Sequence, residues 1–352
     1  MKNAIQQMYL QAHNVWVPRW FEIFSDPAGG FYERLDADLK PIDMPRRLVM
    51  QCRQIMVYSM ADREHYAEKL AEGFSYMRRV YDVNGIPVFN PTERHYDLYA
   101  LAFILSACAA YRTKEAFAYA DSVLEFIQIH FAADVGLYES LDLSLKPRAV
   151  QRRQNPHMHL LEGALAMLEA TGDMRYRTLA DDMVALFFDR FFNGTHLFEF
   201  FDADLKNPLT IVEAGHHAEW VWLLDWYKKH AGADPRINAA QERLYAFATV
   251  HGIDRQYGGV YNQQNIDGSI VEENKRIWPQ METLRAACIM RDEAVQNHFV
   301  TLLQQKYLHA DGIWTEELDR HSRSKADWLP GTTPYHVYPV LKASLDSLNE
   351  AA

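Results

Sequence analysis

The amino-acid sequence predicts an all-α fold, an (α/α)6 barrel of six helical hairpins with short β-hairpin loops at one end. Three observations support this prediction. A glycine-containing segment recurs six times, two helical stretches separate successive segments, and unusual polar residues stand at similar offsets from the glycines. Residues 1–352 are therefore expected to form one domain, a single catalytic barrel.

Each recurring segment begins with glycine, continues with aromatic or apolar residues and ends in a polar turn. The glycines are 55, 51, 58, 64 and 54 residues apart, so six units of similar length cover almost the whole chain. Such segments, ending in Asp, Lys-Pro or Asp-Gly, predict a short hairpin or extended loop. The six glycines are Gly30, Gly85, Gly136, Gly194, Gly258 and Gly312.

Two helices are expected between successive hairpins. Residues 159–173 carry apolar side chains at i, i+3, i+4 and i+7 and end at Gly172, and residues 174–192 form a second helical stretch. The same plan appears at residues 99–131 and 278–308. Closing six such hairpins into a ring would bury both ends and leave one central pocket, so we prefer a barrel to an open solenoid.

Composition and charge restrict the function. The net charge of -11 argues against a nucleic-acid partner, which requires a basic face. The N-terminal residues do not resemble a secretory signal, and the sequence contains no run of 18 apolar residues that could form a membrane helix. Three widely spaced cysteines fit a reducing compartment. The cytoplasm is therefore the expected location.

Polar residues follow the hairpin glycines at offsets of 22 to 24 residues. Equal offsets in a pseudo-symmetric ring would place these side chains at one depth, pointing towards the axis. Because buried polar groups are costly unless they are paired or bind a ligand, the set predicts a functional pocket. Its members are Arg53, His159, His216, Gln280 and His336, with Tyr99 as the candidate from the more tightly spaced second unit.

Local motifs strengthen this prediction. Asn155 and His159 are four residues apart, on one face of a helix start. His216 and Glu219 are three apart, so the carboxylate could orient the imidazole and raise its basicity. Aromatic side chains beside polar ones suit a sugar, whose ring stacks while its hydroxyls form hydrogen bonds. The stretch RIWPQME adds Trp278, Gln280 and Glu282 to the candidates.

At NPHMHLLE, GHHAEWVWLL and RIWPQME the sequence resembles the N-acylglucosamine 2-epimerase superfamily over essentially its full length, most closely the D-mannose isomerase branch related to sulfoquinovose isomerases. The resemblance implies an (α/α)6 barrel that interconverts aldoses and ketoses, or epimerises C2, without a metal. It also implies which residues line the sugar site: Arg53, Asn155, His159, His216, Glu219, Trp278 and His336.

The predicted reaction is aldose–ketose isomerisation of D-mannose, or of D-lyxose, through a cis-enediol by histidine acid–base catalysis. Histidine is the side chain that exchanges a proton near neutral pH, which this chemistry requires. His336 would move the proton between C2 and C1, and His216, held by Glu219, would open the sugar ring. Arg53 and His159 would stabilise the enediolate oxygens.

Two other enzyme classes stay open. A 2-epimerase acting on mannose or an N-acylhexosamine needs a second base on the opposite face, which His216 could provide. A glycoside hydrolase on the same barrel needs a carboxylate pair, for which Glu219 and Glu282 are the candidates.

No cofactor and no metal ion are expected. The partner is a monosaccharide, with no nucleic acid and no membrane, and the chain is expected to be a monomer or a homodimer. Arg53 and Arg276 are the basic residues of the motifs, which favours an uncharged sugar.

Overall fold

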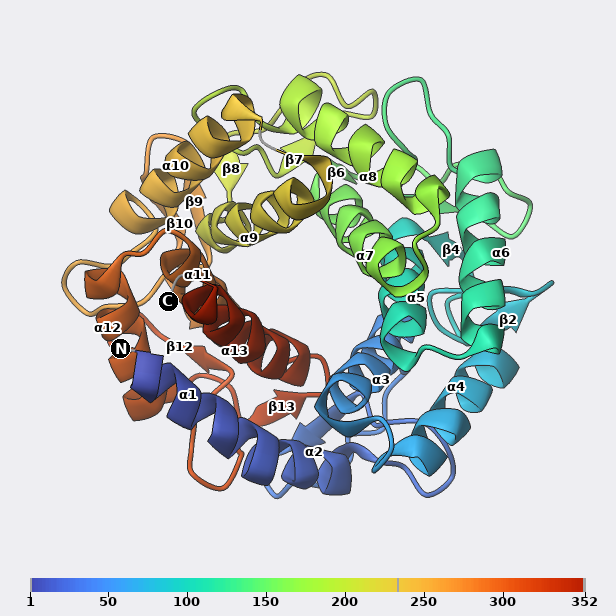
Figure 1. Cartoon of the computed structure of the whole chain (residues 1–352), viewed down its shortest axis with the longest axis horizontal. Coiled ribbons are helices and arrows are strands. Elements are labelled where there is room, and N and C mark those ends of the chain that lie inside the picture. The colour runs from blue at the N-terminus through green and yellow to red at the C-terminus, as the bar shows by residue number, and fades with distance from the viewer. Residues whose placement is uncertain (1, 233, 351–352) are drawn as a thin grey trace.

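The computed structural model describes residues 2–232 and 234–350, and its inner layer is a ring of helices (Figure 1). Each inner helix contacts the next, and the last one contacts the first, so the ring is closed. This arrangement agrees with the predicted helical hairpins. In the described residues the inner helices are α3 (Leu48–Asp62), α5 (Leu98–Tyr111), α7 (Asn155–Thr171), α9 (Ala214–Ala231), α11 (Ile277–Ile289) and α13 (Pro334–Asn349).

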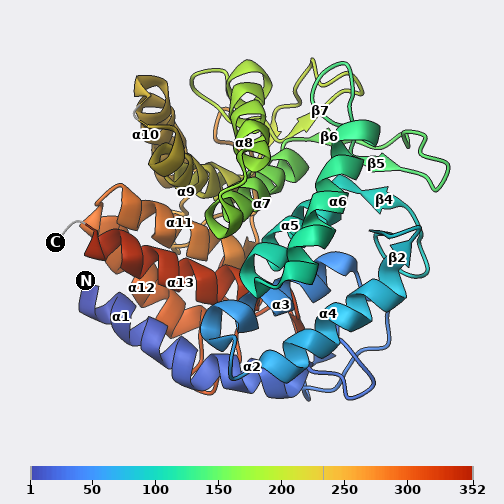
Figure 2. The same ribbon diagram turned by 45° about the vertical axis from the view of Figure 1, so that its right-hand side comes forward.

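The other helices form a layer outside this ring, as Figure 2 shows for α4 and α6 beside α3 and α5. Each inner helix packs against the outer helix that follows it, and α13 packs against the first helix of the chain. The outer α-helices are α1 (Lys2–Gln11), α2 (Val17–Phe24), α4 (Ala67–Tyr81), α6 (Lys114–His130), α8 (Met174–Leu186), α10 (Pro235–Val250) and α12 (Glu293–Leu302). Short π-helical turns extend three of them: η1 (Ala12–Trp16), η2 (Phe187–Phe191) and η3 (Leu303–Tyr307).

Burial differs between the two layers. Almost every residue from Leu98 to Ala109 of the inner helix α5 is buried, whereas the outer helix α4 buries one face through residues such as Leu70, Phe74 and Met77. A helix that is apolar all round belongs in an interior, and an amphipathic one covers it. The hydrophobic core therefore lies between the layers, and the polar residues of the inner ring face its centre. Within the described residues no helix is long and apolar enough to cross a membrane.

The turns from inner to outer helices carry clear sequence signals. The α7 helix ends at Gly172, whose φ is +72°, as the expected glycine stop requires. Outer helices then begin at residues whose side chains accept a backbone N–H. These N-caps are Thr113, Asp173, Asp234 and Asp292.

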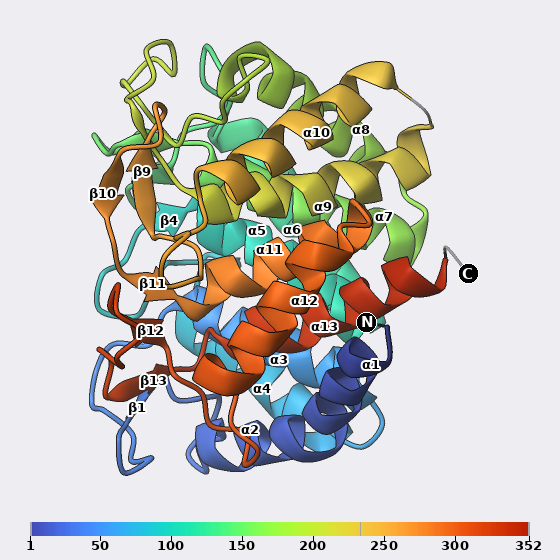
Figure 3. The same ribbon diagram turned by 90° about the vertical axis from the view of Figure 1, so that its left-hand side faces the viewer.

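The connections from outer to inner helices all lie at one end of the ring and carry the glycine segments (Figure 3). All six hairpin glycines have φ between +63° and +91°, a conformation that glycine adopts without strain. The expected short hairpins are present. In the second unit β2 (Asp82–Val83) pairs with β3 (Ile86–Pro87), and in the other five a single bridge closes the turn. We call the second residue of each bridge the closing residue: Phe31, Leu137, Leu197, Val260 and Trp314.

Strands of neighbouring units also pair with one another, which the sequence did not indicate. All these pairs are antiparallel, and one of them joins the first unit to the last. The pairs between units are β1 (Arg34–Asp36) with β13 (Trp328–Pro330), β4 (Tyr96–Asp97) with β5 (Ser140–Leu141), β6 (Arg152–Arg153) with β7 (Phe200–Phe201), β8 (Ile211–Val212) with β9 (Gln263–Asn265), and β11 (Lys275–Arg276) with β12 (Glu317–Leu318). Within the fifth unit β9 also pairs with β10 (Ile270–Glu272).

The side chain 20 residues after the closing residue forms hydrogen bonds that anchor the inner helix to its hairpin. Gln51 accepts a hydrogen bond from Phe31 N (3.0 Å) and donates one to Phe31 O (2.9 Å). Two residues further along an α-helix the side-chain direction has rotated by about 200°. The residue two positions after each anchoring side chain therefore points away from the hairpin and into the ring. Gln280 makes both bonds to Val260, whereas His157 and His217 only accept the backbone N–H of Leu137 and Leu197.

Candidate active site

Five buried side chains, each 22 residues after a closing residue, meet inside the ring, and we call them the axial layer. One donor atom each of Glu219, Glu282 and His336 lies within 4.8 Å of the others. Contacts also cross the ring, because Tyr335 of α13 donates a 2.6 Å hydrogen bond to Glu162 of α7. The members of the axial layer are Arg53, His159, Glu219, Glu282 and His336.

Three histidines of the inner ring each hold a buried carboxylate through Nδ1. This contact leaves Nε2 of each ring on the side away from its carboxylate, where it is available to a substrate. The histidines are 2 %, 5 % and 8 % exposed, so all three are buried inside the ring. We call the centre of the ring, which these histidines surround, the chamber. The pairs are His159 with Glu162 (2.7 Å), His216 with Glu199 (2.7 Å) and His336 with Glu282 (3.0 Å).

Arg53 is held rigidly beside His159. Its Nη2 donates to the Tyr99 hydroxyl (2.8 Å), and its guanidinium carbon lies 4.5 Å from the ring centroids of both Phe103 and Tyr335. Tyr99 and Phe103 also contact the His159 ring, with centroids 5.1 and 4.7 Å apart. The aromatic rings keep water from the cation, which strengthens its action on a developing negative charge.

Trp278 lies between the other two histidines. Its ring centroid is 4.9 Å from that of His216 and 5.6 Å from that of His336. Asn155 completes this wall, because its Nδ2 lies 3.2 Å from His216 Nε2. The two amide positions of asparagine exchange on rotation, so a turned Asn155 would accept a hydrogen bond from His216 Nε2 at its buried Oδ1, which otherwise has no partner among the described residues.

The expected pairing of His216 with Glu219 is wrong. Glu199 holds His216 Nδ1 at 2.7 Å, and Glu213 lies 3.5 Å from the same nitrogen. Glu219 instead faces Glu282 and His336, and among the described residues neither of its buried carboxylate oxygens has a hydrogen-bond partner. Burial and the neighbouring Glu282 raise the pKa of Glu219 to about 8, so this carboxyl is neutral at pH 7.

Glu199 was not among the predicted residues, although the repeats contain a signal for it. Two residues after the closing residue, five units carry Glu33, Glu139, Glu199, Asn262 and Glu316. In three of them the side chain accepts the backbone N–H found 14 residues later, at Arg47 (2.7 Å), Arg153 (2.8 Å) and Arg276 (2.9 Å). Glu199 departs from this role and binds Gln154 Nε2 (2.9 Å) and His216.

The two candidates from RIWPQME that follow Trp278 lie on opposite sides of α11. Gln280 binds the hairpin backbone of Val260 and the carbonyl of Arg276, so its polar atoms are occupied away from the chamber. Glu282 lies behind His336, where it also receives an ion pair from Arg285. The geometry therefore gives Gln280 a structural role and makes Glu282 a support for His336.

The histidines differ in basicity. Burial lowers the pKa of His216, but Glu199 and Glu213 raise it more strongly, to about 9. Burial, with Arg53 and His159 nearby, lowers the pKa of His336 well below its usual value. Burial also lowers the pKa of His159, despite its hydrogen bond to Glu162. At neutral pH these shifts favour the cationic form of His216 and the neutral form of His336.

The axial layer also offers three donors of the types that bind metal ions, Glu219, Glu282 and His336. Arg285 is ion-paired with Glu282, however, and would repel a cation placed there. His336 already uses Nδ1 to hold Glu282. This donor set fits a divalent cation poorly, and metal independence stays a prediction.

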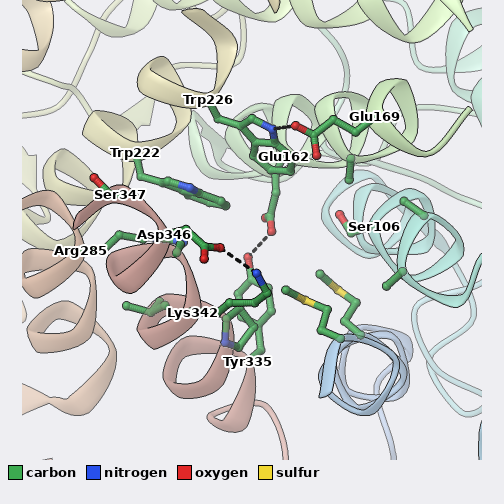
Figure 4. A pocket seen from close by; sticks show the side chains of 18 of the residues that line it. Ser106, Glu162, Glu169, Trp222, Trp226, Arg285, Tyr335, Lys342, Asp346 and Ser347 are labelled. Carbon is green, nitrogen blue, oxygen red and sulfur yellow. Dashed lines mark hydrogen bonds and ion pairs between the residues drawn. The ribbon is translucent and has the colours of Figure 1, made fainter. Parts of the chain in front are cut away.

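A cavity of about 500 Å³ lies behind the axial layer (Figure 4). The C-terminal halves of the inner helices line it, and the three site histidines are absent from its lining among the described residues. Glu162, Glu282 and Tyr335 line this cavity, and Figure 4 shows the hydrogen bond between Glu162 and Tyr335. Glu162 and Glu282 also bind His159 and His336, so they connect the lining of the cavity with the site histidines.

Comparison with known proteins identifies relatives of the whole chain. The chain is 28 % identical to "Mannose-6-phosphate isomerase" of Rhizobium meliloti strain 1021 over 359 aligned positions, which cover 91 % of each chain. It is 24 % identical to "Cellobiose 2-epimerase" of Dictyoglomus turgidum, covering 81 % of this chain and 80 % of the relative. A crystal structure of D-mannose isomerase superposes with a TM-score of 0.88 at 20 % identity over 99 % of this chain and 98 % of the other, which shows a shared fold.

The family model of N-acylglucosamine 2-epimerase (GlcNAc 2-epimerase) matches residues 30–340, which include all six hairpin glycines and every member of the axial layer. The relatives of this chain are named as sugar isomerases and epimerases, so the chain is an enzyme of that general class. The chain belongs to the N-acylglucosamine 2-epimerase family.

Proposed function

We propose that the chain is a metal-independent aldose–ketose isomerase that converts a D-mannose-type aldose into the corresponding ketose through a cis-enediol. One catalytic (α/α)6 barrel spanning residues 1–352 would carry this activity. The observation that supports the proposal best is the contrast between His216 and His336. A cationic acid and a neutral base in one chamber are what ring opening and proton abstraction require.

The reaction begins with opening of the sugar ring. His216 donates its Nε2 proton to the ring oxygen as the bond from C1 to that oxygen breaks. The anomeric hydroxyl releases its proton to water, from which His216 is protonated again. Glu199 and Glu213 keep His216 protonated for this step. Asn155, beside Nε2, orients the imidazole towards the ring oxygen.

Isomerisation follows in the open-chain sugar. Neutral His336 takes the proton from C2 at Nε2, and the electrons form the cis-enediolate. The same nitrogen then returns the proton to C1, while a proton passes from the oxygen on C2 to that on C1. Arg53 and His159 stabilise the negative charge on these oxygens, and Glu282 holds His336 in place throughout.

Epimerisation at C2 is the second candidate, and the cellobiose 2-epimerase among the relatives favours it. In that reaction another acid returns the proton to the opposite face of C2, and His216 is the available group. A glycoside hydrolase has less support, because an inverting pair of carboxylates stands about 6.5–9.5 Å apart. Glu219 and Glu282 instead lie against each other, within 4.8 Å.

Product analysis by NMR in D2O separates these reactions. D-mannose, D-glucose, D-fructose and D-lyxose are incubated separately with the purified protein. Fructose formed from mannose supports isomerisation, whereas glucose as the first product supports epimerisation. His336→Ala and His216→Ala should each lower kcat by about 10²- to 10⁴-fold. Wild-type turnover in either variant would exclude the proposed acid–base pair.

The cytoplasmic location, the absence of a cofactor and the monomeric or homodimeric state stay predictions.

A further inference from the structure

Three arginines occupy the same position in alternate units of the repeat, and we call them the arginine collar: Arg47, Arg153 and Arg276. Each stands 16 residues after a closing residue, immediately before or at the start of an inner helix. The backbone N–H of each is bound by a hairpin side chain, at 2.7, 2.8 and 2.9 Å. Their side chains are 39 %, 38 % and 37 % exposed, so the three guanidinium groups are equally accessible.

The collar borders the chamber. In the fourth unit the equivalent residue is Glu213, whose carboxylate lies 3.5 Å from His216 Nδ1 and 3.9 Å from Arg276. The Arg276 guanidinium carbon is also 5.4 Å from the centroid of Trp278, which contacts both His216 and His336. This repeat position therefore forms the rim above the catalytic histidines.

The spacing between the collar and the axial layer matches a sugar. Six residues separate each collar arginine from the axial-layer position of its own unit, which corresponds to about 9 Å along a helix. A sugar with C1 and C2 beside His336 would extend its far end towards the rim. An open-chain hexose with a phosphate on its last carbon has a comparable length.

The positive charge of the collar is only partly neutralised. Arg47 is ion-paired with Glu33. Arg153 is paired with Glu139 at 3.3 Å, but burial raises the pKa of Glu139 to about 7, which leaves part of the arginine charge free. The Arg276 side chain donates to the neutral Asn262 Oδ1 at 3.3 Å, and its ion pair with Glu213 is long, at 3.9 Å. Burial also raises the pKa of Glu213, which weakens that pair. Arg153 and Arg276 are therefore the collar members best able to bind an added anion.

We propose that Arg153 and Arg276, with Arg47 completing the collar, bind a tetrahedral anion at the far end of the sugar, so that the enzyme prefers a hexose 6-phosphate to a neutral hexose. The guanidinium group suits this role because it binds phosphate oxygens through two parallel N–H donors. A sulfonate shares this chemistry and is separated from phosphate by the experiment. The inference rests on the proposed isomerase function and replaces the uncharged sugar favoured by the sequence motifs.

The test compares initial isomerisation rates on D-mannose, D-mannose 6-phosphate and a hexose bearing a sulfonate at C6. For wild type we expect kcat/KM to be at least about tenfold higher on the phosphate ester than on mannose. Arg276→Gln and Arg153→Gln should each reduce the ratio of these kcat/KM values by about 10- to 100-fold, mainly through KM. Preference for the sulfonate over the phosphate would assign the collar to sulfonates and overturn the phosphate assignment.

Arg323→Gln is the matched control. Arg323 is an exposed arginine at the same end of the ring, paired with Asp319, and its loss should leave the selectivity ratio unchanged. Mannose preferred by wild type, or an equal loss on both substrates in the collar variants, would overturn the proposal. If wild type converts none of the three sugars, the proposed function fails. In that case the affinity for D-mannose 6-phosphate, measured by calorimetry, tests anion binding by the collar. Equal affinity in wild type and Arg276→Gln would refute the proposal.

Discussion

Replacing Glu199 with glutamine should move the alkaline limit of activity to lower pH. Glu199 is 2.7 Å from His216 Nδ1, and together with Glu213 it raises the pKa of this histidine to about 9. Activity requires protonated His216, so it is lost as the pH rises through that pKa. Glutamine keeps the shape of the side chain and removes its charge, which makes the imidazolium less stable.

The size of the shift follows from the contact that is lost. A hydrogen bond to a charged group contributes about 1.5–3 kcal/mol, and one pKa unit corresponds to about 1.4 kcal/mol. The alkaline limb should therefore move down by about one to two units, from about 9 to between about 7 and 8. Glu213, 3.5 Å away, remains and prevents a larger change.

The assay is kcat against pH from about 5 to 10 for wild type, Glu199→Gln and a matched control. Glu33→Gln alters the equivalent position of the first unit, where the side chain binds Arg47 N, and should leave the alkaline limb in place. An unshifted limb in Glu199→Gln, or the same shift in both variants, would refute the assignment of His216 as the acid.

Three further predictions address the other roles. Gln280→Ala should lower the free energy of unfolding, measured by urea denaturation, by about 2 kcal/mol, because it removes the hydrogen bonds to Val260. The KM of this variant should change less than about twofold. A large rise in KM at unchanged stability would instead support substrate binding by Gln280. Glu219→Gln should retain kcat within about threefold at pH 7, because the carboxyl that it replaces is already neutral, and a hundredfold loss would show that the ionised form acts. Dialysis against EDTA should leave kcat unchanged, because Arg285 makes the axial layer unsuitable for a cation, whereas loss that Mn²⁺ or Zn²⁺ restores would contradict this reading.

The repeat made much of the architecture predictable. The hairpin glycines need positive φ, and the helix stop at Gly172 marks a turn between layers, so the sequence contains the plan of helices and hairpins. Pairing between strands of neighbouring units was not predictable. Strands of two or three residues, such as β4 and β5, are too short to show a hydrophobic pattern that would identify their partners.

The offsets from the hairpin glycines grouped His159, His216 and His336 around one chamber. They could not predict in which direction the side chains near these positions point. One residue along a helix rotates the side chain by about 100°, so an uncertainty of one or two positions changes its direction completely. The interval from glycine to closing residue is one residue at Gly136 and three at Gly194. For this reason Gln280 and His216 share an offset of 22 from their glycines, yet Gln280 faces the hairpin and His216 the chamber.

The repeat also explains why two carboxylates lie beside His216. In the first and third units a hairpin glutamate binds both the backbone N–H and the side chain of the arginine 14 residues later, as Glu33 does with Arg47. In the fourth unit that arginine is replaced by Glu213, so Glu199 has no cationic partner at this position and binds His216 instead. Two carboxylates then flank one imidazole. With Glu213 in place of an arginine, the fourth unit has two carboxylates that favour the protonated form of His216, whereas the first and third units have an ion pair between glutamate and arginine.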